Sequence, residues 1–336
     1  MSITLKEIAD MAGVHKSTVD KVIHNRPGVS DTKRQQIRQL LNEHGYASNP
    51  LAKALNYQKK KLTVAVVLPP VDATPELRAG AERVQQDFIS FNIELQYFTP
   101  VSAAEQAECL LSLCKRRIAG AVICPIEDAS VANALSALHE AGVPVVTVNS
   151  DLTNTPRLCF VGQDMVQSGQ TAARLISLLL GGQGELGIIS SRNMHAAIHR
   201  KQAFLEYLSP HWPGIHVTEI IDINETPEQA YQLTCGLLTR QPSLQALFIT
   251  CGCVPDICRA VRDCGFAGKL TILCFERYPD VARLIDAGEI TCTISGGLQE
   301  QGHAAMRLLF EYLIYDRIPA QSQVYTKNEI LFRENI

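Results

Sequence analysis

The chain has 336 residues, of which 46% are apolar, and its formal net charge is −3. This length predicts two or three domains with at least one large core. The N-terminus is polar and no later apolar run approaches the roughly 18 residues that a membrane helix needs, so we expect neither a signal peptide nor an anchor and place the protein in the cytoplasm.

The charge is divided unevenly between the start of the chain and the rest. The first 61 residues contain 11 lysines and arginines against 5 aspartates and glutamates, which leaves +6 there and −9 on the remainder. A basic head on an acidic body indicates that the head alone has a polyanion as its partner. The alternative interpretation is an ordinary solvated basic face.

The first 45 residues are predicted to form three short helices. Thr4 and Glu7 have the spacing of a capping box, and the apolar residues that follow share one helical face. Gly13 then breaks the chain before a second helix of roughly Lys16 to His24. Ser30 is expected to cap the third helix.

The second helix is the part of this head that carries a functional signal. Its apolar residues turn inward, so Lys16, Ser17, Asp20 and Lys21 must lie on its open side. A helix, a tight glycine turn and a short second helix with polar residues at its start form the helix-turn-helix arrangement, which places the second helix in the major groove of DNA.

A short segment with helical signals, Asn49 to Asn56, follows the head. Asn49 can cap it and Pro50 suits its first helical position, but it is too short to be stable alone. We therefore expect it to be ordered only when something packs against it. The domains predicted are a DNA-binding head over 1–48, this helical segment and a lysine-rich linker over 49–61, and a larger domain over 62–336.

From Leu62 the pattern changes to apolar strands that alternate with amphipathic helices. The predicted strands are 62–69, 93–98, 119–125, 143–149, 158–162, 185–190, 217–222, 246–250, 270–275 and 290–295. Such nearly continuous apolar strands need helices on both faces. The fold class is therefore α/β, with a small all-α head and a doubly wound parallel sheet or, with so many strands, two such sheets side by side. A cleft between two such sheets would be the ligand site.

The sequence offers little support for an enzyme. The glycines of 181–184 precede a strand and are interpreted as a turn, and we find no Walker loop, nucleophile elbow or His-Glu-x-x-His motif. Cys251, Cys253, Cys258 and Cys264 cluster in the sequence, but they lack the paired spacing of a zinc knuckle. We interpret them as buried thiols and expect no catalytic residue, metal or cofactor.

Several segments of the head and hinge resemble the lactose-repressor/purine-repressor family. They are residues 4–14 (TLKEIADMAGV), Ser17-Thr18-Val19, Val29-Ser30, and Tyr46 followed by Asn49. The resemblance covers the rest of the chain as an architecture of two sheet lobes, similar to periplasmic sugar-binding proteins, between which the chain crosses more than once. It implies that 49–61 hold a hinge helix and linker and that 62–336 form an effector-binding and dimerisation domain. The lobes of that domain are a lobe 1 of about 62–161 with 292–321 and a lobe 2 of about 162–291 with 322–336.

For the head, the resemblance implies that Lys16, Ser17 and Lys21 face base edges. The side chains implied to contact phosphates are Thr4, His15, Thr18, Ser30, Tyr46 and Asn49. The hinge helix is implied to pair with that of a dimer mate and to insert Leu55 into the minor groove, with small residues such as Ala52 permitting the approach. His15 and Asp20-Lys21 depart from the family's usual residues, so we expect a different operator.

For the lobes, the resemblance implies effector contacts at strand ends, where open sheets bind ligands. They are Asp72, Glu76, Asn149, Asp151, Asp164, Arg192, His195, Arg200, Cys251, Glu276 and Arg277. Cys251-Gly252 and Gly296-Gly297 stand where the family usually has side chains that grip sugar hydroxyls, while the arginines make a sugar acid or phosphorylated sugar an alternative to a neutral sugar. The competing interpretation of Arg200 and Arg277 is a surface or interlobe ion pair.

The hypothesis that follows is a homodimeric repressor of the lactose-repressor type. Its partners are operator DNA and a small effector, which is a sugar, sugar acid, polyol or sugar phosphate, and no membrane is involved. Two heads on one core gain affinity by effective concentration and fix the spacing of half-sites. The alternatives are a solute-binding protein of the periplasmic type with a basic extension and, less favoured, a thiol enzyme.

Overall fold

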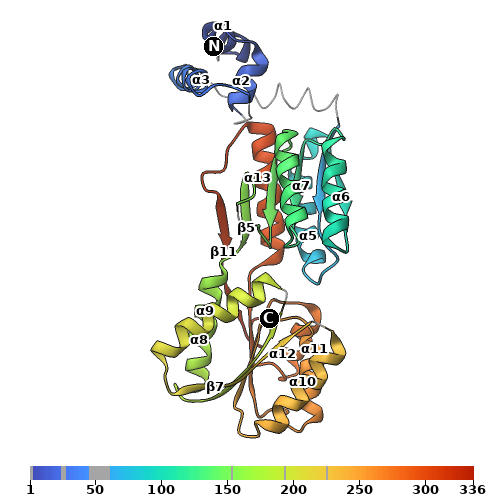
Figure 1. Cartoon of the computed structure of the whole chain (residues 1–336), viewed down its shortest axis with the longest axis vertical. Coiled ribbons are helices and arrows are strands. Elements are labelled where there is room, and N and C mark those ends of the chain that lie inside the picture. The colour runs from blue at the N-terminus through green and yellow to red at the C-terminus, as the bar shows by residue number, and fades with distance from the viewer. Residues whose placement is uncertain (1–2, 24–27, 45–60, 153, 193, 225) are drawn as a thin grey trace. The chain divides into compact units, whose positions relative to one another are not determined.

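The computed structural model describes residues 3–23, 28–44, 61–152, 154–192, 194–224 and 226–336 (Figure 1). The chain divides into two compact units. Unit 1 comprises Met1–Val161 and Gly302–Val324, and unit 2 comprises Gly162–Gln301 and Tyr325–Ile336. The chain therefore crosses between the units three times. Among the described residues, no helix has both the length and the apolar character needed to cross a membrane.

The head contains the three predicted helices. They are α1 (Leu5–Ala12), α2 (Lys16–Ile23) and α3 (Asp31–Glu43). The predicted capping box is confirmed, because the Thr4 hydroxyl accepts a hydrogen bond from the Glu7 N–H and the Glu7 carboxylate accepts one from the Thr4 N–H. Gly13 ends α1 at a φ of 64°, in the left-handed region that favours glycine.

The core of the head is a small apolar cluster of its own. Ile8 from α1, Val19 from α2 and Ile37 from α3 are fully buried in it. The Lys33 ammonium adds a polar link, donating to the Ala12 carbonyl at the end of α1 over 2.9 Å. These contacts hold α2 in one orientation relative to α1 and α3.

The sheet of unit 1 has six strands in the order β11-β5-β4-β3-β1-β2. Their bounds are β1 (Leu62–Val67), β2 (Ile93–Phe98), β3 (Gly120–Ile123), β4 (Val145–Val148), β5 (Cys159–Gln163) and β11 (Gln323–Thr326). The helices are α5 (Thr74–Asp87), the short 3-10 helix η1 (Ile89–Phe91), α6 (Ala103–Cys114), α7 (Ala129–Glu140) and α13 (Leu298–Tyr315). β1 to β5 pair in parallel.

Helices cover both faces of this sheet, as the nearly continuous apolar strands require. On one face, α6 and α7 pack with β1 and β3 in a shared apolar cluster. On the other, α5 approaches α13 so closely that a Cβ on Gly302 would lie 2.0 Å from the Leu77 carbonyl oxygen. Only glycine allows that approach.

The sheet of unit 2 has the order β12-β10-β9-β8-β6-β7. Its strands are β6 (Gly184–Ser191), β7 (Ile215–Ile223), β8 (Ala246–Ile249), β9 (Thr271–Phe275), β10 (Cys292–Ser295) and β12 (Glu329–Leu331). Its helices are α8 (Met165–Leu179), α9 (His195–His211), α10 (Pro227–Arg240), α11 (Val254–Asp263) and α12 (Pro279–Asp286). α8 and α9 cover one face, and α10 to α12 cover the other. The predicted α/β class with two parallel-dominated sheets is confirmed.

Two features of the topology differ from the expectations. The pattern did not indicate β11 and β12, which are short, and β12 runs antiparallel to β10. Residues 292–301 were expected in lobe 1 but belong to unit 2, because β10 pairs with β9. The third crossing lies between Val324 and Tyr325, three residues after the expected position.

Candidate functional site

The exposed side of α2 is the candidate DNA-reading surface of the head. Lys16, Ser17 and Lys21 are exposed on it, while Val19 and Val22 are buried on the opposite side. Because the apolar side of α2 is packed on the core of the head, its polar side chains face solvent together on the other side. Asp20 is half-buried and has interactions of its own.

His15 begins α2 in place of an ordinary capping side chain. Its Nδ1 accepts a hydrogen bond from the Ser17 N–H at 3.3 Å and lies 2.9 Å from the Ser17 hydroxyl. The imidazole thereby takes the role that a serine or aspartate oxygen usually has at a helix start. Thr18 is half-buried, and Ser30 is exposed just before α3. Tyr46, Asn49, Ala52 and Leu55 lie outside the described residues.

In unit 2, polar residues gather where the parallel strands end. Arg192 follows β6, Cys251 lies two residues after β8, and Glu276 follows β9. Glu276 has a φ of 65°, a left-handed conformation that is uncommon for a residue with a side chain. Backbone conformations of this kind persist only where the surroundings enforce them. Here the Glu276 N–H donates to the Ile294 carbonyl, and its own carbonyl accepts from the Thr293 hydroxyl.

Arg200 and Glu276 form a buried ion pair. The Arg200 Nη2 lies 2.8 Å from the Glu276 Oε1, and the two side chains are 8% and 7% exposed. The guanidinium also lies over the Phe275 ring, 4.1 Å from its centroid. Since a buried charge is costly unless it is paired, each partner holds the other in place. Arg200 thus forms an ion pair, but the pair is buried and lies within unit 2, so it is neither the surface pair nor the interlobe pair of the competing interpretation.

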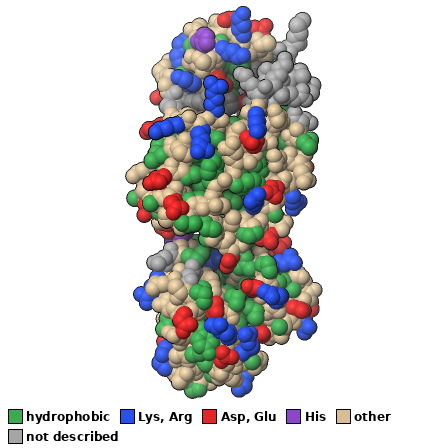
Figure 2. Space-filling view, turned by 90° about the vertical axis from the view of Figure 1, so that its right-hand side faces the viewer, with side chains coloured by type: hydrophobic (Ala, Val, Ile, Leu, Met, Phe, Trp, Pro, Cys, Tyr) green, Lys and Arg blue, Asp and Glu red, His purple; other side chains and the backbone are tan. Residues whose placement is uncertain are grey.

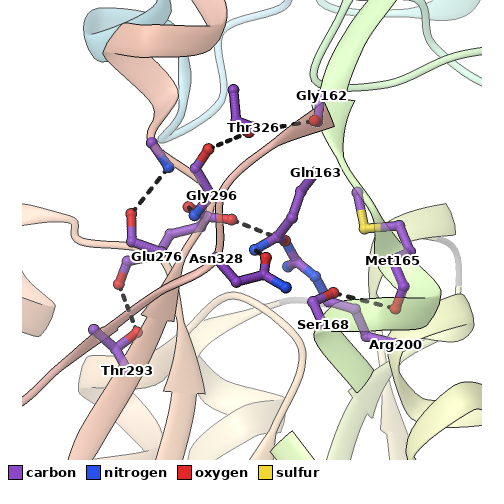
Figure 3. Close-up of polar contacts among 12 residues, drawn as sticks. Gly162, Gln163, Met165, Ser168, Arg200, Glu276, Thr293, Gly296, Thr326 and Asn328 are labelled. Atoms are coloured by element: carbon purple, nitrogen blue, oxygen red, sulfur yellow. Dashed lines mark hydrogen bonds and ion pairs between the residues drawn. The ribbon is translucent and has the colours of Figure 1, made fainter. Parts of the chain in front are cut away.

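The ion pair belongs to a larger set of hydrogen bonds, shown in Figure 3, that we call the Arg200 network: Gln163, Arg200, Glu276, Gly296, Thr326 and Asn328. Arg200 donates a hydrogen bond to the Gln163 Oε1. The Nε2 of the same Gln163 side chain donates to the Asn328 Oδ1 at 2.7 Å. The Glu276 Oε2 accepts from the Gly296 N–H at 3.1 Å. All of these residues lie in unit 2.

One donor of this network has no partner among the described residues. The Arg200 Nε is buried and makes no hydrogen bond there, although Nη2 is bonded twice. A buried donor of this kind costs free energy, which an acceptor from a ligand would recover. The helix that carries it is fixed closely against α8, because Gly169 has no Cβ and one there would lie 2.5 Å from the Arg200 carbonyl oxygen.

The predicted effector residues of unit 1 lie at or near strand ends, and one is already engaged. Asp151 accepts from the Thr147 hydroxyl at 2.8 Å and pairs with Arg157 at 2.6 Å. Asn149, directly after β4, has a φ of 63°. Asp72 is exposed before α5, and Glu76 is half-buried in its first turn.

The remaining predicted effector residues of unit 2 are dispersed. The Asp164 carboxylate caps α8 by accepting from the Gln167 N–H, and the exposed Arg192 donates to the Asp222 carbonyl. His195 begins α9, with its ring centroid 3.9 Å from that of His199. Cys251 is buried in the core, and Arg277 is exposed. Arg200 and Glu276, which the sequence also predicted, are joined directly by their ion pair.

The cysteines are free thiols, several of them deep in the core. Burial raises the pKa of Cys124 to about 11 and the pKa of Cys274 to about 12. In the cluster singled out from the sequence, burial raises the pKa of Cys258 to about 12 and that of Cys264 to about 11. A reactive thiol needs the opposite shift. Of the four clustered cysteines, Cys251 and Cys258 are buried as predicted, whereas Cys253 and Cys264 are only partly buried at the edge of the core.

Sequence reasoning missed Thr326 and Asn328. They lie on β11 and just after it, more than 160 residues from Gln163. The only signal that could have pointed to them is the polarity of the segment Thr326-Lys327-Asn328 between two short strands.

Comparison with known proteins gives two family matches. The model of the bacterial regulatory proteins of the lacI family matches residues 4–49, and that of a periplasmic binding protein domain matches residues 64–316. The chain is 33% identical to the HTH-type transcriptional regulator TreR of Escherichia coli (strain K12) over 34% of this chain and 36% of that protein. It therefore matches about a third of that relative's length.

Two further similarities cover more of the matched protein. The sucrose operon repressor of Vibrio alginolyticus is 36% identical over 27% of this chain and 93% of the repressor sequence. The crystal structure of a putative LacI transcriptional regulator from Bacteroides fragilis superposes with a TM-score of 0.74 at 20% identity, covering 82% of this chain and 98% of that one. This structural likeness shows the fold.

Proposed function

Because the chain belongs to the lacI family of bacterial regulatory proteins, we propose that it is a sequence-specific transcription repressor whose affinity for operator DNA is controlled by a sugar-like effector. The observation that carries this proposal is the joint presence of a helix-turn-helix head and a periplasmic-binding-type domain in one chain. A helix-turn-helix head serves no purpose in the rival hypothesis, which is a solute-binding protein of the periplasmic type. We assign no reaction to the chain.

The head supports DNA binding through the side chains that α2 presents. Lys16, Ser17 and Lys21 form its exposed polar face, and lysine can donate to the guanine acceptors of the major groove. The excess of six positive charges over the first 61 residues favours attraction to phosphates. DNA binding also requires access to the chromosome, so we place the protein in the cytoplasm.

For the effector, we propose an uncharged polyhydroxylated molecule that contacts Arg200 and Glu276. The buried guanidinium is already compensated by the Glu276 carboxylate, so a phosphate or carboxylate ligand would face a buried negative charge as well as a positive one. Sugar hydroxyls both donate and accept, which suits a site that offers a carboxylate and the unpartnered Arg200 Nε.

We further propose that the protein acts as a homodimer through unit 1. Figure 2 shows apolar side chains gathered on the drawn face of this unit. The exposed apolar residues of unit 1 as a whole include Ile89, Val101 and Leu111. Surfaces of this kind mark interfaces. Leu111→Asp should give monomers in analytical ultracentrifugation, whereas Leu178→Asp, the same change at an exposed residue of unit 2, should leave the dimer intact.

The proposal is tested with the full chain in two steps. Selection from a library of random DNA duplexes should recover a two-fold symmetric sequence, whose binding falls steeply with salt. A thermal-shift screen should then use D-ribose, D-galactose, sucrose, sorbitol, D-glucuronate and glucose 6-phosphate, since a true effector raises the Tm by mass action.

A positive screen leads to a linkage measurement. The sugar that raises the Tm should change the affinity for the selected duplex, and the duplex should change the affinity for that sugar by the same factor, typically about 5- to 150-fold. Recovery of no duplex sequence would overturn the DNA assignment. A response to glucose 6-phosphate alone would overturn the assignment of an uncharged effector.

A further inference from the structure

The three crossings between the units all contribute to the Arg200 network. Gly162 and Gln163 follow the first crossing, Gly296 precedes the second by a few residues, and Thr326 and Asn328 follow the third. We call these three stretches, 162–163, 296–301 and 325–328, the crossing segments. They are far apart in the sequence, yet their polar groups meet within unit 2 (Figure 3).

Thr326 joins the backbones of the other two crossing segments. Its hydroxyl oxygen lies 3.2 Å from the Gly162 carbonyl oxygen and 2.5 Å from that of Gly296. A single hydroxyl proton can serve both acceptors only while the two carbonyls stay close together. Displacement of one crossing segment therefore weakens its link to the other two.

Each end of the ion pair is bonded to a different crossing segment. Arg200 donates to the Gln163 Oε1 after the first crossing, and Glu276 accepts from the Gly296 N–H before the second. Gln163 then extends the connection to Asn328, after the third. A ligand that displaces the Arg200–Gln163 bond or the Gly296–Glu276 bond therefore changes what one of the crossing segments is bonded to.

The packing around Gly296 leaves little room to absorb such a change. A Cβ at this position would lie 3.0 Å from the Gln301 Nε2 and 3.1 Å from the Gln163 Cδ. Well-packed groups have discrete alternative arrangements and do not deform continuously. A shift of the Gln163 side chain is thus passed to the backbone at Gly296.

We propose that Gln163, Thr326 and Asn328 couple the state of the Arg200–Glu276 pair to all three crossing segments, so that an effector at this pair acts on the three at once. The inference rests on the proposed function in taking Arg200 and Glu276 as effector contacts. Gln163 and Thr326 are positioning residues in this scheme. Their role is to make the equilibrium of the crossing segments depend on the ion pair.

The first test needs no effector and uses amide hydrogen exchange on the full chain. Glu276→Gln weakens the hydrogen bonds that Glu276 makes with Arg200 and Gly296. Amide exchange is then measured over residues 325–331, which contain Thr326 and Asn328. We expect exchange there to become at least about fivefold faster, the lower end of typical coupling between sites. Gln163→Leu removes the route through Arg200 and Asn328, and Thr326→Val removes the route through Gly296, so in either protein adding Glu276→Gln should change exchange less than in the wild type. In a protein with both replacements, adding it should change exchange less than twofold.

Matched controls separate coupling from general damage. Thr239→Val and Gln202→Leu remove the same groups from exposed positions of unit 2, where Thr239 bonds the Cys235 carbonyl and Gln202 bonds Glu206. In these backgrounds Glu276→Gln should retain its full effect at 325–331. Thr326→Val preserves the shape of the side chain, so it serves where Gln163→Leu does not fold. Exchange at 325–331 that is unaffected by Glu276→Gln, or equally affected in all backgrounds, overturns the inference.

The second test uses the sugars of the thermal-shift screen. A sugar that raises the Tm of the wild type should also change exchange at 325–331, and Thr326→Val should keep the Tm response while showing a smaller exchange response. An undiminished exchange response in Thr326→Val overturns the coupling role. If none of the six compounds raises the Tm, the effector assignment fails, and the first test alone decides the coupling.

Discussion

Replacement of Glu276 by glutamine tests whether the buried ion pair organises unit 2. The carboxylate offers two acceptor oxygens, of which one receives the Arg200 Nη2 and the other the Gly296 N–H. A glutamine amide has only one oxygen, so either the guanidinium or the Gly296 N–H must then face an NH2 group. The side-chain volume is almost unchanged, which isolates the charge and hydrogen-bond effect.

The size of the effect follows from burial. Both side chains are more than nine-tenths buried, and removal of one partner leaves the Arg200 charge without compensation in surroundings that offer little solvent. Breaking a buried pair in this way costs about 3–5 kcal/mol. Because Gln can retain one of the two hydrogen bonds, we expect a loss near the lower limit, about 3 kcal/mol in the free energy of unfolding.

Urea unfolding followed by tryptophan fluorescence measures this loss where it occurs, because the only tryptophan, Trp212, lies in unit 2. The matched control is Glu219→Gln, which removes the charge from a carboxylate paired with Arg240 at 2.5 Å, where the arginine is 54% exposed. An exposed pair contributes about 0–1 kcal/mol. Equal losses in the two variants would refute the argument that burial makes the Arg200–Glu276 pair decisive.

Three further predictions concern other parts of the chain. Thr4→Ala removes the hydroxyl that caps α1 and should destabilise the head by about 1 kcal/mol in thermal unfolding. Hydrogen bonds from the Thr4 N–H and hydroxyl hold the pKa of Glu7 below its ordinary 4.5, so the separate stabilisation by the Glu7 carboxylate should be present above that pH and lost as the pH falls, and a loss on raising the pH instead would contradict it. Leu55→Ala should weaken binding to the selected duplex by about 1–3 kcal/mol and leave random DNA unaffected in mobility-shift titrations, while equal weakening on both would indicate damage to the head. Since burial raises the pKa of Cys274 to about 12, mass spectrometry after iodoacetamide treatment at pH 8 should find it alkylated only once the protein is unfolded, and rapid labelling of the native protein would show that the thiol is accessible.

The head is the part of the protein that the sequence determines most completely. The capping box, the Gly13 turn and the apolar stripe of each helix are interactions between residues a few positions apart, so a local pattern is enough to specify them. The ten apolar runs of the lobes likewise predict strands β1 to β10, because a strand covered on both faces must be apolar along its length. The resemblance brought Arg200 and Glu276 forward as candidate site residues.

The tertiary structure decided which of these residues meet. Arg200 and Glu276 are 76 positions apart and Gln163 and Asn328 are 165 apart, and no periodicity relates such residues. The sequence pattern did not predict β11, because its residues alternate between exposed and half-buried positions at the edge of the sheet. They therefore form no apolar run. The position of the second crossing followed from the pairing of β10 with β9, which places residues 292–301 in unit 2. Long-range pairing of this kind depends on how whole sheets assemble, so the Arg200 network exists only once unit 2 has folded.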